Sequence, residues 1–331
     1  MQEFRIVNRA AAWLRSIVSE TANICLDLFK IMIPILVLVK ALEMLGATTY
    51  LAAVLAPMMA ALGLPPEMGI VWAGTMLSNI YTGMVLFVSE PAASQLSVQQ
   101  VTIMGLLMLI AHSLPVELRV AQKIGVSLLL SFVIRILTAY AAAWVYFLLS
   151  TFISDTPGSA NILWDPNIEQ QTIFMWIQSQ FRLLLQIVLI VGALVVVLRI
   201  IRILKLDRLI HLVLRPVLPV LGLTEKAVNV VLVGITLGLS YGGGLLIQES
   251  RQGGLGAREL FFSVCLLLLC HGLIEDTLLI LLLGADIYGI LVFRLLFSFA
   301  LIAFMVFLTR HKDETFFTRH LLNGNYPASR T

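Results

Sequence analysis

Charged side chains are scarce in this sequence. Asp, Glu, Lys and Arg make up only 12% of the 331 residues, whereas 60% are apolar, and the mean hydropathy is +0.98. A soluble globular chain carries about 25% charged and about 45–50% apolar residues. Because this apolar surplus is too large for one core surrounded by water, the composition predicts that lipid is the solvent. The same composition excludes a disordered chain, collagen and a coiled coil.

Cysteine is also rare, and neither sign of charge dominates. Cys25, Cys265 and Cys270 are scattered in or near apolar runs, which excludes a disulfide framework or zinc spacing and is typical of small buried side chains. The formal net charge is only +3, without a basic patch interleaved with aromatics, so nucleic acid is not an expected partner. The sequence lacks the hydrolase elbow, the zinc-protease motif, the P-loop and the Rossmann glycines, so we expect neither an enzyme nor a cofactor.

What the chain does contain is an internal repeat. Rare residues of the first half recur at one constant offset, the 159 residues that separate His112 from His271. The matching pairs are Pro57 and Pro216, Gly83 and Gly242, Glu90 and Glu249, His112 and His271, Gly125 and Gly284, and Arg135 and Arg294. Apolar matches are common by chance in a membrane protein, but Pro, Glu, His and Arg at one offset are not. The sequence therefore predicts two related repeats.

The distribution of Lys and Arg predicts how the repeats are oriented. If each repeat crosses the membrane five times, nearly all basic residues between the apolar stretches fall on one side. Segment 117–123 carries Arg119 and Lys123, whereas its counterpart 275–287 carries no basic residue. Opposite charge bias in matching loops indicates inverted repeats. We expect an all-α polytopic membrane protein with two inverted repeats of about five helices each, containing broken or re-entrant helices.

The same pattern predicts where the chain lies and how it is divided. The positive side is cytoplasmic, so both termini are expected in the cytoplasm. The regions are an amphipathic interfacial helix at 1–22, repeat 1 at 23–150, a periplasmic linker with a second interfacial helix at 151–181, repeat 2 at 182–310 and a cytoplasmic tail at 311–331. Apolar segments 48–62 and 208–222 are short, and whether they cross the membrane is left open.

The first candidate site is an interrupted helix in each repeat. Polar residues and glycines gather in the middle of two otherwise apolar segments; they are Asn79, Tyr81, Thr82 and Gly83 in the first, and Ser240, Tyr241, Gly242, Gly243 and Gly244 in the second. Irregular backbone within a membrane exists only where protein or a watery cavity satisfies it, so these residues are candidates for substrate binding. The alternative is a close helix crossing, since small residues let backbones approach.

A second candidate is the acidic pair Glu90 and Glu249, seven residues after the aligned glycines. Carboxylates within a membrane are costly and usually functional, which suggests coupling to an ion or a proton. Both residues also lie near predicted helix ends, where an ordinary solvated carboxylate is equally expected.

The third candidate combines histidines with carboxylates. His112 is followed by Glu117, and His271 is followed by Glu275 and Asp276, each within five residues and next to a helix break. Such groups can bind a polar substrate or relay a proton, and the three carboxylates join Glu90 and Glu249 as candidates for coupling. A histidine can also donate to a carbonyl and do nothing more. Metal ligation is conceivable chemically, but no segment supplies a complete ligand set, so no metal site is assigned. Arg135 and Arg294 are expected to pair with carboxylates or carbonyls between helices.

The repeated segments LSNIYTGMVLF, LSYGGGLLIQE, HSLPVE and HGLIEDTLLI resemble the nucleoside-recognition, or Gate-domain, membrane proteins. That superfamily includes parts of concentrative nucleoside transporters, the membrane part of ferrous-iron transporter B, and spore maturation proteins A and B. The resemblance covers most of residues 24–310. It implies an inverted-repeat polytopic fold in a bacterial inner membrane and a transport-like function, but it does not supply a substrate.

The leading hypothesis is a permease for a small polar solute, nucleoside-like or another small metabolite, that works by alternating access. The expected partners are that solute, H+ or Na+ as a coupling ion, and the lipid bilayer, with a homo-oligomer left open. Two alternatives remain: a non-transporting membrane subunit of a larger complex, and a divalent metal-ion pore that uses Glu90, Glu249 and the histidine–acid segments.

Overall fold

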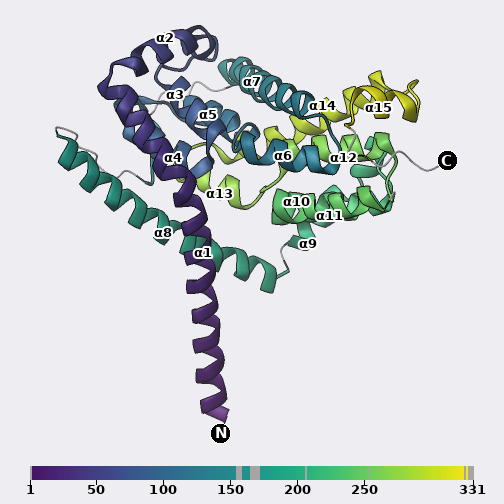
Figure 1. Cartoon of the computed structure of the whole chain (residues 1–331), viewed down its shortest axis with the longest axis horizontal. Coiled ribbons are helices and arrows are strands. Elements are labelled where there is room, and N and C mark those ends of the chain that lie inside the picture. Colours follow the sequence, from purple (N-terminus) through teal and green to yellow (C-terminus); the bar gives the residue numbers. More distant parts are fainter. Residues whose placement is uncertain are drawn as a thin grey trace.

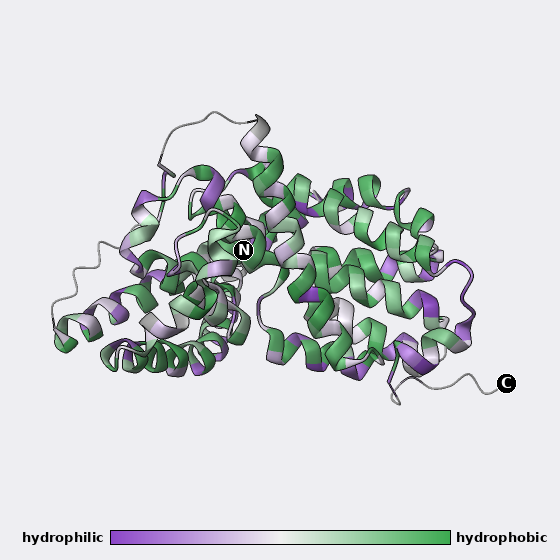
Figure 2. Ribbon diagram, turned by 90° about the horizontal axis from the view of Figure 1, so that it is seen from above, coloured by the Kyte–Doolittle hydropathy of each residue, from purple (hydrophilic) through white to green (hydrophobic). Residues whose placement is uncertain are grey.

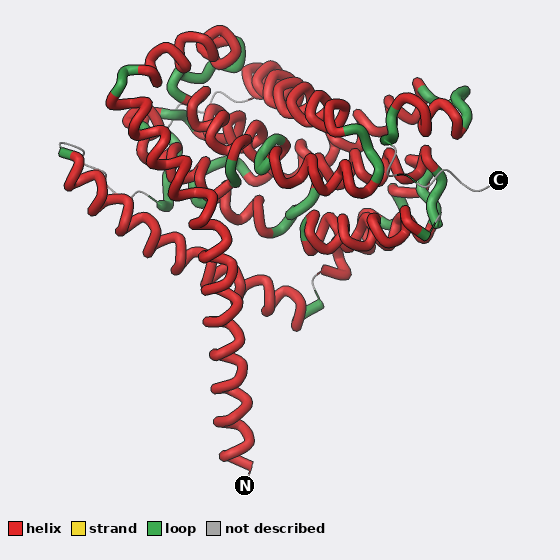
Figure 3. Tube along the Cα trace, viewed as in Figure 1, coloured by secondary structure: helices red, strands yellow, loops and turns green. Residues whose placement is uncertain are grey.

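The computed structural model describes residues 2–153, 159–164, 172–205, 207–252, 254–323 and 326. Within these ranges the chain is built from helices and contains no strand (Figure 3), apart from two isolated bridges, Ser97 to Ser159 and Val126 to Leu322. The helices are α1 (Gln2–Met44), α2 (Ala47–Ala60), α3 (Met68–Leu77), α4 (Ile80–Ser89), α5 (Val98–Ile110), α6 (Leu114–Ile124), α7 (Leu128–Ile153), α8 (Ile173–Ile203), α9 (Asp207–Leu214), α10 (Glu225–Leu237), α11 (Leu239–Arg251), α12 (Ala257–Cys270), α13 (Glu275–Leu281), α14 (Arg294–Leu308) and α15 (Glu314–His320).

Five helical segments of the described chain are long and apolar enough to cross a membrane: Ala12–Met44, Leu128–Thr151, Ile173–Ile203, Ala257–Leu281 and Tyr288–Leu308. Helices α5 and α6, bent by 42°, form a sixth if the pair counts as one span. Apolar residues run along most of the helices (Figure 2), as lipid-facing surfaces require. The chain is an all-α polytopic membrane protein.

The two halves repeat the same helix order. Helices α1 to α6 correspond to α8 to α13, and α7 corresponds to a π-helical turn, η3 (Tyr288–Phe293), followed by α14. Equivalent side chains also make equivalent bonds. Arg135 Nε donates to Ile110 O and Arg294 Nε donates to Leu269 O, and the two pairs are related by the same offset of 159 residues. The internal repeat of the sequence is therefore a repeat of the structure.

The apolar segments 66–89 and 226–248 fold as helical hairpins rather than as straight spans. Gly83 of α4 lies beside Thr75 of α3, and Gly242 of α11 lies against the backbone of Gly234 of α10. The arms have 10 residues in the first hairpin and 13 in the second, so they rise only about 15–20 Å, about half to two-thirds of the hydrocarbon thickness. Similarly, 48–62 forms the 14-residue α2, and 208–222 forms α9 and a short 3-10 turn, η2 (Leu218–Leu221), so neither qualifies as a span. The long spans are thus fewer than the five crossings per repeat assumed above.

Three predicted region boundaries fall inside helices, and one of them, between residues 150 and 151, lies near the end of α7. Helix α1 runs without a break past residue 22, and α8 begins at Ile173, inside the predicted linker. The sequence contains no Pro or Gly before Pro34, so nothing separates the amphipathic start from the following span. Helix α1 crosses α8 partway along its length, and the N-terminal part of α1 extends away from the rest of the molecule (Figure 1). Linker residues 154–158 and 165–171 lie outside the described ranges.

Part of the C-terminal tail packs on the membrane body. The Phe317 side chain of α15 is fully buried, with ring centroids 6.0 Å from Phe261 and 5.8 Å from Phe262 of α12. Leu322 forms the bridge with Val126. The described part of the tail is therefore anchored to the second repeat and to the end of α6.

Candidate functional site

All four helix breaks of the two repeats line one cavity of about 780 Å³. The hairpin tips contribute Ser78 and Asn79 from the first repeat and Gly238 from the second. The turns between α5 and α6 and between α12 and α13 contribute Ser113 and Gly272 with their neighbours. Residues of α1 and α8 complete the wall. Because each repeat supplies both kinds of break, the cavity lies between the repeats.

Local chemistry explains why the helices break at these points. Asn79 adopts an extended conformation, and its Oδ1 accepts from the Thr82 backbone N–H at 2.9 Å, which caps α4. Gly238 separates α10 from α11 with a φ of 89°, which only glycine adopts without strain. Ser113 and Gly272, each directly after a histidine, also have positive φ values, 49° and 60°. A left-handed residue at the same place in both repeats ends α5 and α12.

The backbone groups freed by the breaks find partners in the neighbouring break. Ser113 N donates to Thr75 O at 3.2 Å in the first repeat, and Leu273 N donates to Ile235 O at 3.0 Å in the second. Each histidine turn is thus hydrogen-bonded to the first arm of the hairpin in its own repeat. This satisfies polar backbone groups that lipid could not, as membrane-embedded chain requires.

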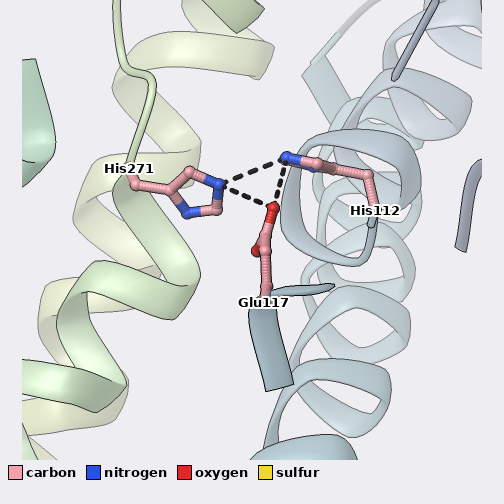
Figure 4. Close-up of side chains that lie close together, drawn as sticks. All are labelled: His112, Glu117 and His271. Carbon is pink, nitrogen blue, oxygen red and sulfur yellow. Dashed lines mark hydrogen bonds and ion pairs between the residues drawn. The ribbon is translucent and has the colours of Figure 1, made fainter. Parts of the chain in front are cut away.

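Two histidines from different repeats and one carboxylate meet at the cavity wall (Figure 4). The Nε2 atoms of His112 and His271 lie 3.2 Å apart, and each lies 3.1 Å from Glu117 Oε1. The three side chains are only 6–9% exposed. A site of this burial holds its geometry because neighbouring atoms fix every side chain.

The tautomers of both imidazoles follow from their backbone partners. His112 Nδ1 lies 3.0 Å from Met108 O, and His271 Nδ1 lies 2.8 Å from Leu267 O. A carbonyl oxygen can only accept, so both Nδ1 atoms carry hydrogen, and neutral imidazoles then present bare Nε2 lone pairs. Three acceptor atoms consequently face one another.

Each repeat also buries an arginine near this cluster, but the two differ. Arg135 Nη1 donates to Glu117 Oε2, the carboxylate oxygen that faces away from the histidines. Arg294 donates instead to the carbonyls of Leu109 and His271. Asp276, the counterpart of Glu117, has a buried Oδ2 without a hydrogen-bond partner, 3.9 Å from His112 Nε2. Asp276 therefore remains free to meet a ligand.

Negative charge predominates among the described residues that line the cavity. The carboxylates are Glu20, Asp27, Glu117, Glu275 and Asp276, and the one arginine of this lining is Arg202. Tyr81 connects the repeats here, because its hydroxyl donates to Glu275 Oε1 at 3.3 Å. Glu20, Asp27 and Glu117 are paired with basic side chains, so Glu275 and Asp276 are the carboxylates of this lining that can attract a cation or the positively charged end of a solute.

The structure brings seven of the predicted site residues to this cavity: Asn79, Tyr81, His112, Glu117, His271, Glu275 and Asp276. Thr82 lies behind the wall, where its hydroxyl is 2.7 Å from Ser78 Oγ and within reach of Asn79 Oδ1. The side chains of Ser240 and Tyr241 lie outside the described part of the structure. The cavity residues Glu20, Asp27 and Arg202 escaped the sequence analysis because each lies on a long helix without a matching partner in the other repeat.

Three of the four predicted glycines lie in close contacts with neighbouring helices or side chains. A Cβ atom at Gly83 would overlap Thr75 Oγ1, one at Gly242 would overlap the Gly234 backbone, and one at Gly243 would press on Val120 Cγ1. Gly244 has open space around it. The three consecutive glycines continue α11, and the break lies earlier, at Gly238. The close crossing that the sequence offered as an alternative accounts for Gly83 and Gly242.

Glu90 and Glu249 lie at the other end of each hairpin from its tip and are absent from the described cavity lining. Burial and then the negative charges of Glu67 and Glu43 raise the pKa of Glu90 to about 7. Glu249 Oε2 forms an ion pair with Lys226 Nζ at 2.5 Å. Their role in ion coupling stays a prediction.

Comparison with known proteins places the chain among membrane proteins. No protein-family model and no solved structure matches it. The uncharacterized membrane protein YvoD of Bacillus subtilis (strain 168) is 26% identical over 269 residues, which cover 80% of this chain and 85% of YvoD. The resemblance to nucleoside-recognition proteins therefore stays a prediction. With its long apolar helices, the chain is a multi-pass membrane protein similar to YvoD.

Proposed function

We propose that this protein is a permease of the bacterial inner membrane that moves a small polar solute by alternating access between inverted repeats. One observation carries the proposal: all four helix breaks meet around a single cavity between the repeats. Broken helices place helix ends and polar backbone groups inside the membrane, and in membrane proteins these are the elements that bind solutes and ions. The described residues around this cavity favour transport over catalysis.

The charges of the lining narrow the proposed solute. Of the five carboxylates that line the cavity, Glu20, Asp27 and Glu117 form ion pairs with basic residues, which leaves Glu275 and Asp276 beside Arg202. The solute is therefore a cation, carries a cationic group or enters together with H+ or Na+. Tyr81 and Glu275 bridge the two repeats at the wall, so relative movement of the repeats breaks or forms that contact. Solute binding and repeat movement are thereby connected.

Uptake into proteoliposomes tests the proposal. Purified protein is reconstituted and offered nucleosides, amino acids and divalent cations, with a proton or sodium gradient across the vesicle. We expect one solute class to accumulate. His112→Ala, His271→Ala or Glu275→Gln should each slow its initial uptake at least about tenfold, because a tenfold change corresponds to the loss of one contact of about 1.4 kcal/mol. His320→Ala is the matched control, because His320 is exposed on α15 away from the cavity.

The pH profile of uptake adds a second measurement. If the histidines handle protons, the dependence near the ordinary histidine pKa of about 6.5 shifts or flattens in at least one variant. Absence of uptake under every gradient, with a partner protein that co-purifies stoichiometrically, would replace transport with an assembly role.

A further inference from the structure

The cluster of His112, Glu117 and His271 needs a positive charge to hold its three facing atoms together. Both Nδ1–H groups donate to carbonyls, so two imidazole lone pairs and one carboxylate oxygen converge within 3.2 Å of one another. Three acceptors at hydrogen-bond distance repel each other unless a positive charge lies between them. Burial strengthens that repulsion, because little water screens it.

The geometry of the three atoms fits a metal ion better than a proton. A proton in a hydrogen bond lies between two atoms, whereas these three atoms form a nearly equilateral triangle with edges of 3.1, 3.1 and 3.2 Å. An ion at a typical zinc–ligand distance of about 2.1 Å from all three would lie about 1 Å out of their plane. Two histidines and one carboxylate on one face of an ion leave its opposite positions open, as in facial-triad metal sites.

The surroundings of the triangle also match a metal site. Metal-binding imidazoles usually donate their other N–H to a carbonyl or carboxylate, and both histidines do so through Met108 and Leu267. Arg135 holds the second oxygen of Glu117, which fixes the carboxylate and leaves Oε1 directed at the histidines.

A fourth ligand is available from the second repeat. Asp276 Oδ2 is buried without a hydrogen-bond partner and lies 3.9 Å from His112 Nε2. Gly272 makes room for it, since a Cβ atom there would overlap this carboxylate. Asp276 brings to the triangle a carboxylate oxygen that no arginine neutralises, so the local charge favours a cation.

We propose that His112, Glu117 and His271, with Asp276 as a fourth ligand, bind one divalent first-row transition-metal ion such as Zn²⁺ or Co²⁺ at the wall of the cavity. Imidazole ligands select such ions over Mg²⁺ and Ca²⁺, which prefer oxygen. The ion connects the two repeats, and its open positions face the cavity. The proposal needs no transport, because it concerns binding to the resting protein.

Metal binding to purified protein tests the proposal. The full chain is purified in detergent through a tag without histidine, stripped with a chelator and titrated with Co²⁺ and then Zn²⁺. We expect one Co²⁺ per chain, visible absorption bands of a nitrogen- and oxygen-bound ion, and displacement by Zn²⁺. His112→Gln and His271→Gln should weaken binding by about 100-fold or more, since loss of a mere supporting group costs 10–100-fold. The control His320→Gln should bind as the wild type does.

A second measurement needs no variant. X-ray absorption of the wild-type protein loaded with Zn²⁺ should show two imidazole ligands and oxygen ligands at about 2.0–2.2 Å. A wild-type protein that binds neither ion, a zinc shell without imidazole, or folded histidine variants that bind Co²⁺ as tightly as the wild type would each overturn the proposal.

Discussion

Glu117 and Asp276 occupy equivalent positions in the two repeats, yet only Glu117 reaches the arginine of its own repeat. Glu117 accepts from Arg135, whereas Arg294 donates to carbonyls and Asp276 Oδ2 has no hydrogen-bond partner. The aspartate side chain is one methylene shorter, which explains the difference. One carboxylate is therefore neutralised by an ion pair and the other is left facing the histidines, so a nearly symmetric site has two unlike halves.

The Arg135–Glu117 ion pair should be costly to break on one side only. Both side chains are buried, so Arg135→Met leaves an uncompensated carboxylate, and we expect it to destabilise the protein by about 3–5 kcal/mol. The double variant Arg135→Met with Glu117→Met should be less destabilised than the single one. Thermal unfolding in detergent measures both. Equal losses in the two proteins would show that the pair carries no such coupling.

Two glycines of α11 should respond in opposite directions to the same change. Gly242→Ala pushes a methyl group into the Gly234 backbone, and we expect a loss of about 1–3 kcal/mol of stability. Gly244→Ala meets no atom within 4 Å, so better helix propensity should stabilise the protein by up to about 1 kcal/mol. Unfolding midpoints of the two variants provide the comparison, and midpoints that shift alike would contradict the packing of this hairpin.

The inverted-repeat hypothesis predicts that the linker and the tail lie on opposite sides of the membrane. Ser159→Cys should react with a membrane-impermeant maleimide in intact cells, whereas Thr315→Cys should react only after the inner membrane is permeabilised. Both positions are exposed, and the native cysteines are buried, which keeps the background low. Labelling of both positions from the same side would exclude the proposed orientation.

Glu90 should make stability depend on pH around neutrality. Burial and then Glu67 and Glu43 raise its pKa to about 7, so the folded protein holds this proton more tightly than the unfolded chain does. The associated stability is fully present below the ordinary value of about 4.5 and is lost as the pH rises to about 7. Glu90→Gln should therefore be more stable than the wild type at about pH 8, by about 1–2 kcal/mol after solvent screening, and not at about pH 4.

The control for this prediction is Glu67→Gln, which keeps Glu90 but removes a neighbouring negative charge. It should give part of the stability gain that Glu90→Gln gives at about pH 8. Melting curves at both pH values check the two variants. A gain from Glu90→Gln that is the same at both pH values would indicate a packing effect instead of a titration.

Several features of this protein followed from the sequence alone. The apolar surplus required lipid as the solvent, because no water-surrounded core could enclose it. The matched histidines, arginines and glycines identified two repeats, and the repeated bonds of Arg135 and Arg294 confirm that equivalent residues occupy equivalent places. Both inferences need only the types of the residues and their spacing along the chain.

Only the tertiary structure decided how these residues meet. A straight span and a hairpin of two half-helices have the same apolar composition, so the hairpins of α3 with α4 and α10 with α11 could not be distinguished from crossings. The contact between His112 and His271, and the different partners of Glu117 and Asp276, depend on how the two repeats pack. His112 and His271 converge because helices of both repeats break at one shared cavity, and Glu117 reaches Arg135 because its side chain is one methylene longer than that of Asp276. Neither contact can be read from the spacing of residues in the sequence.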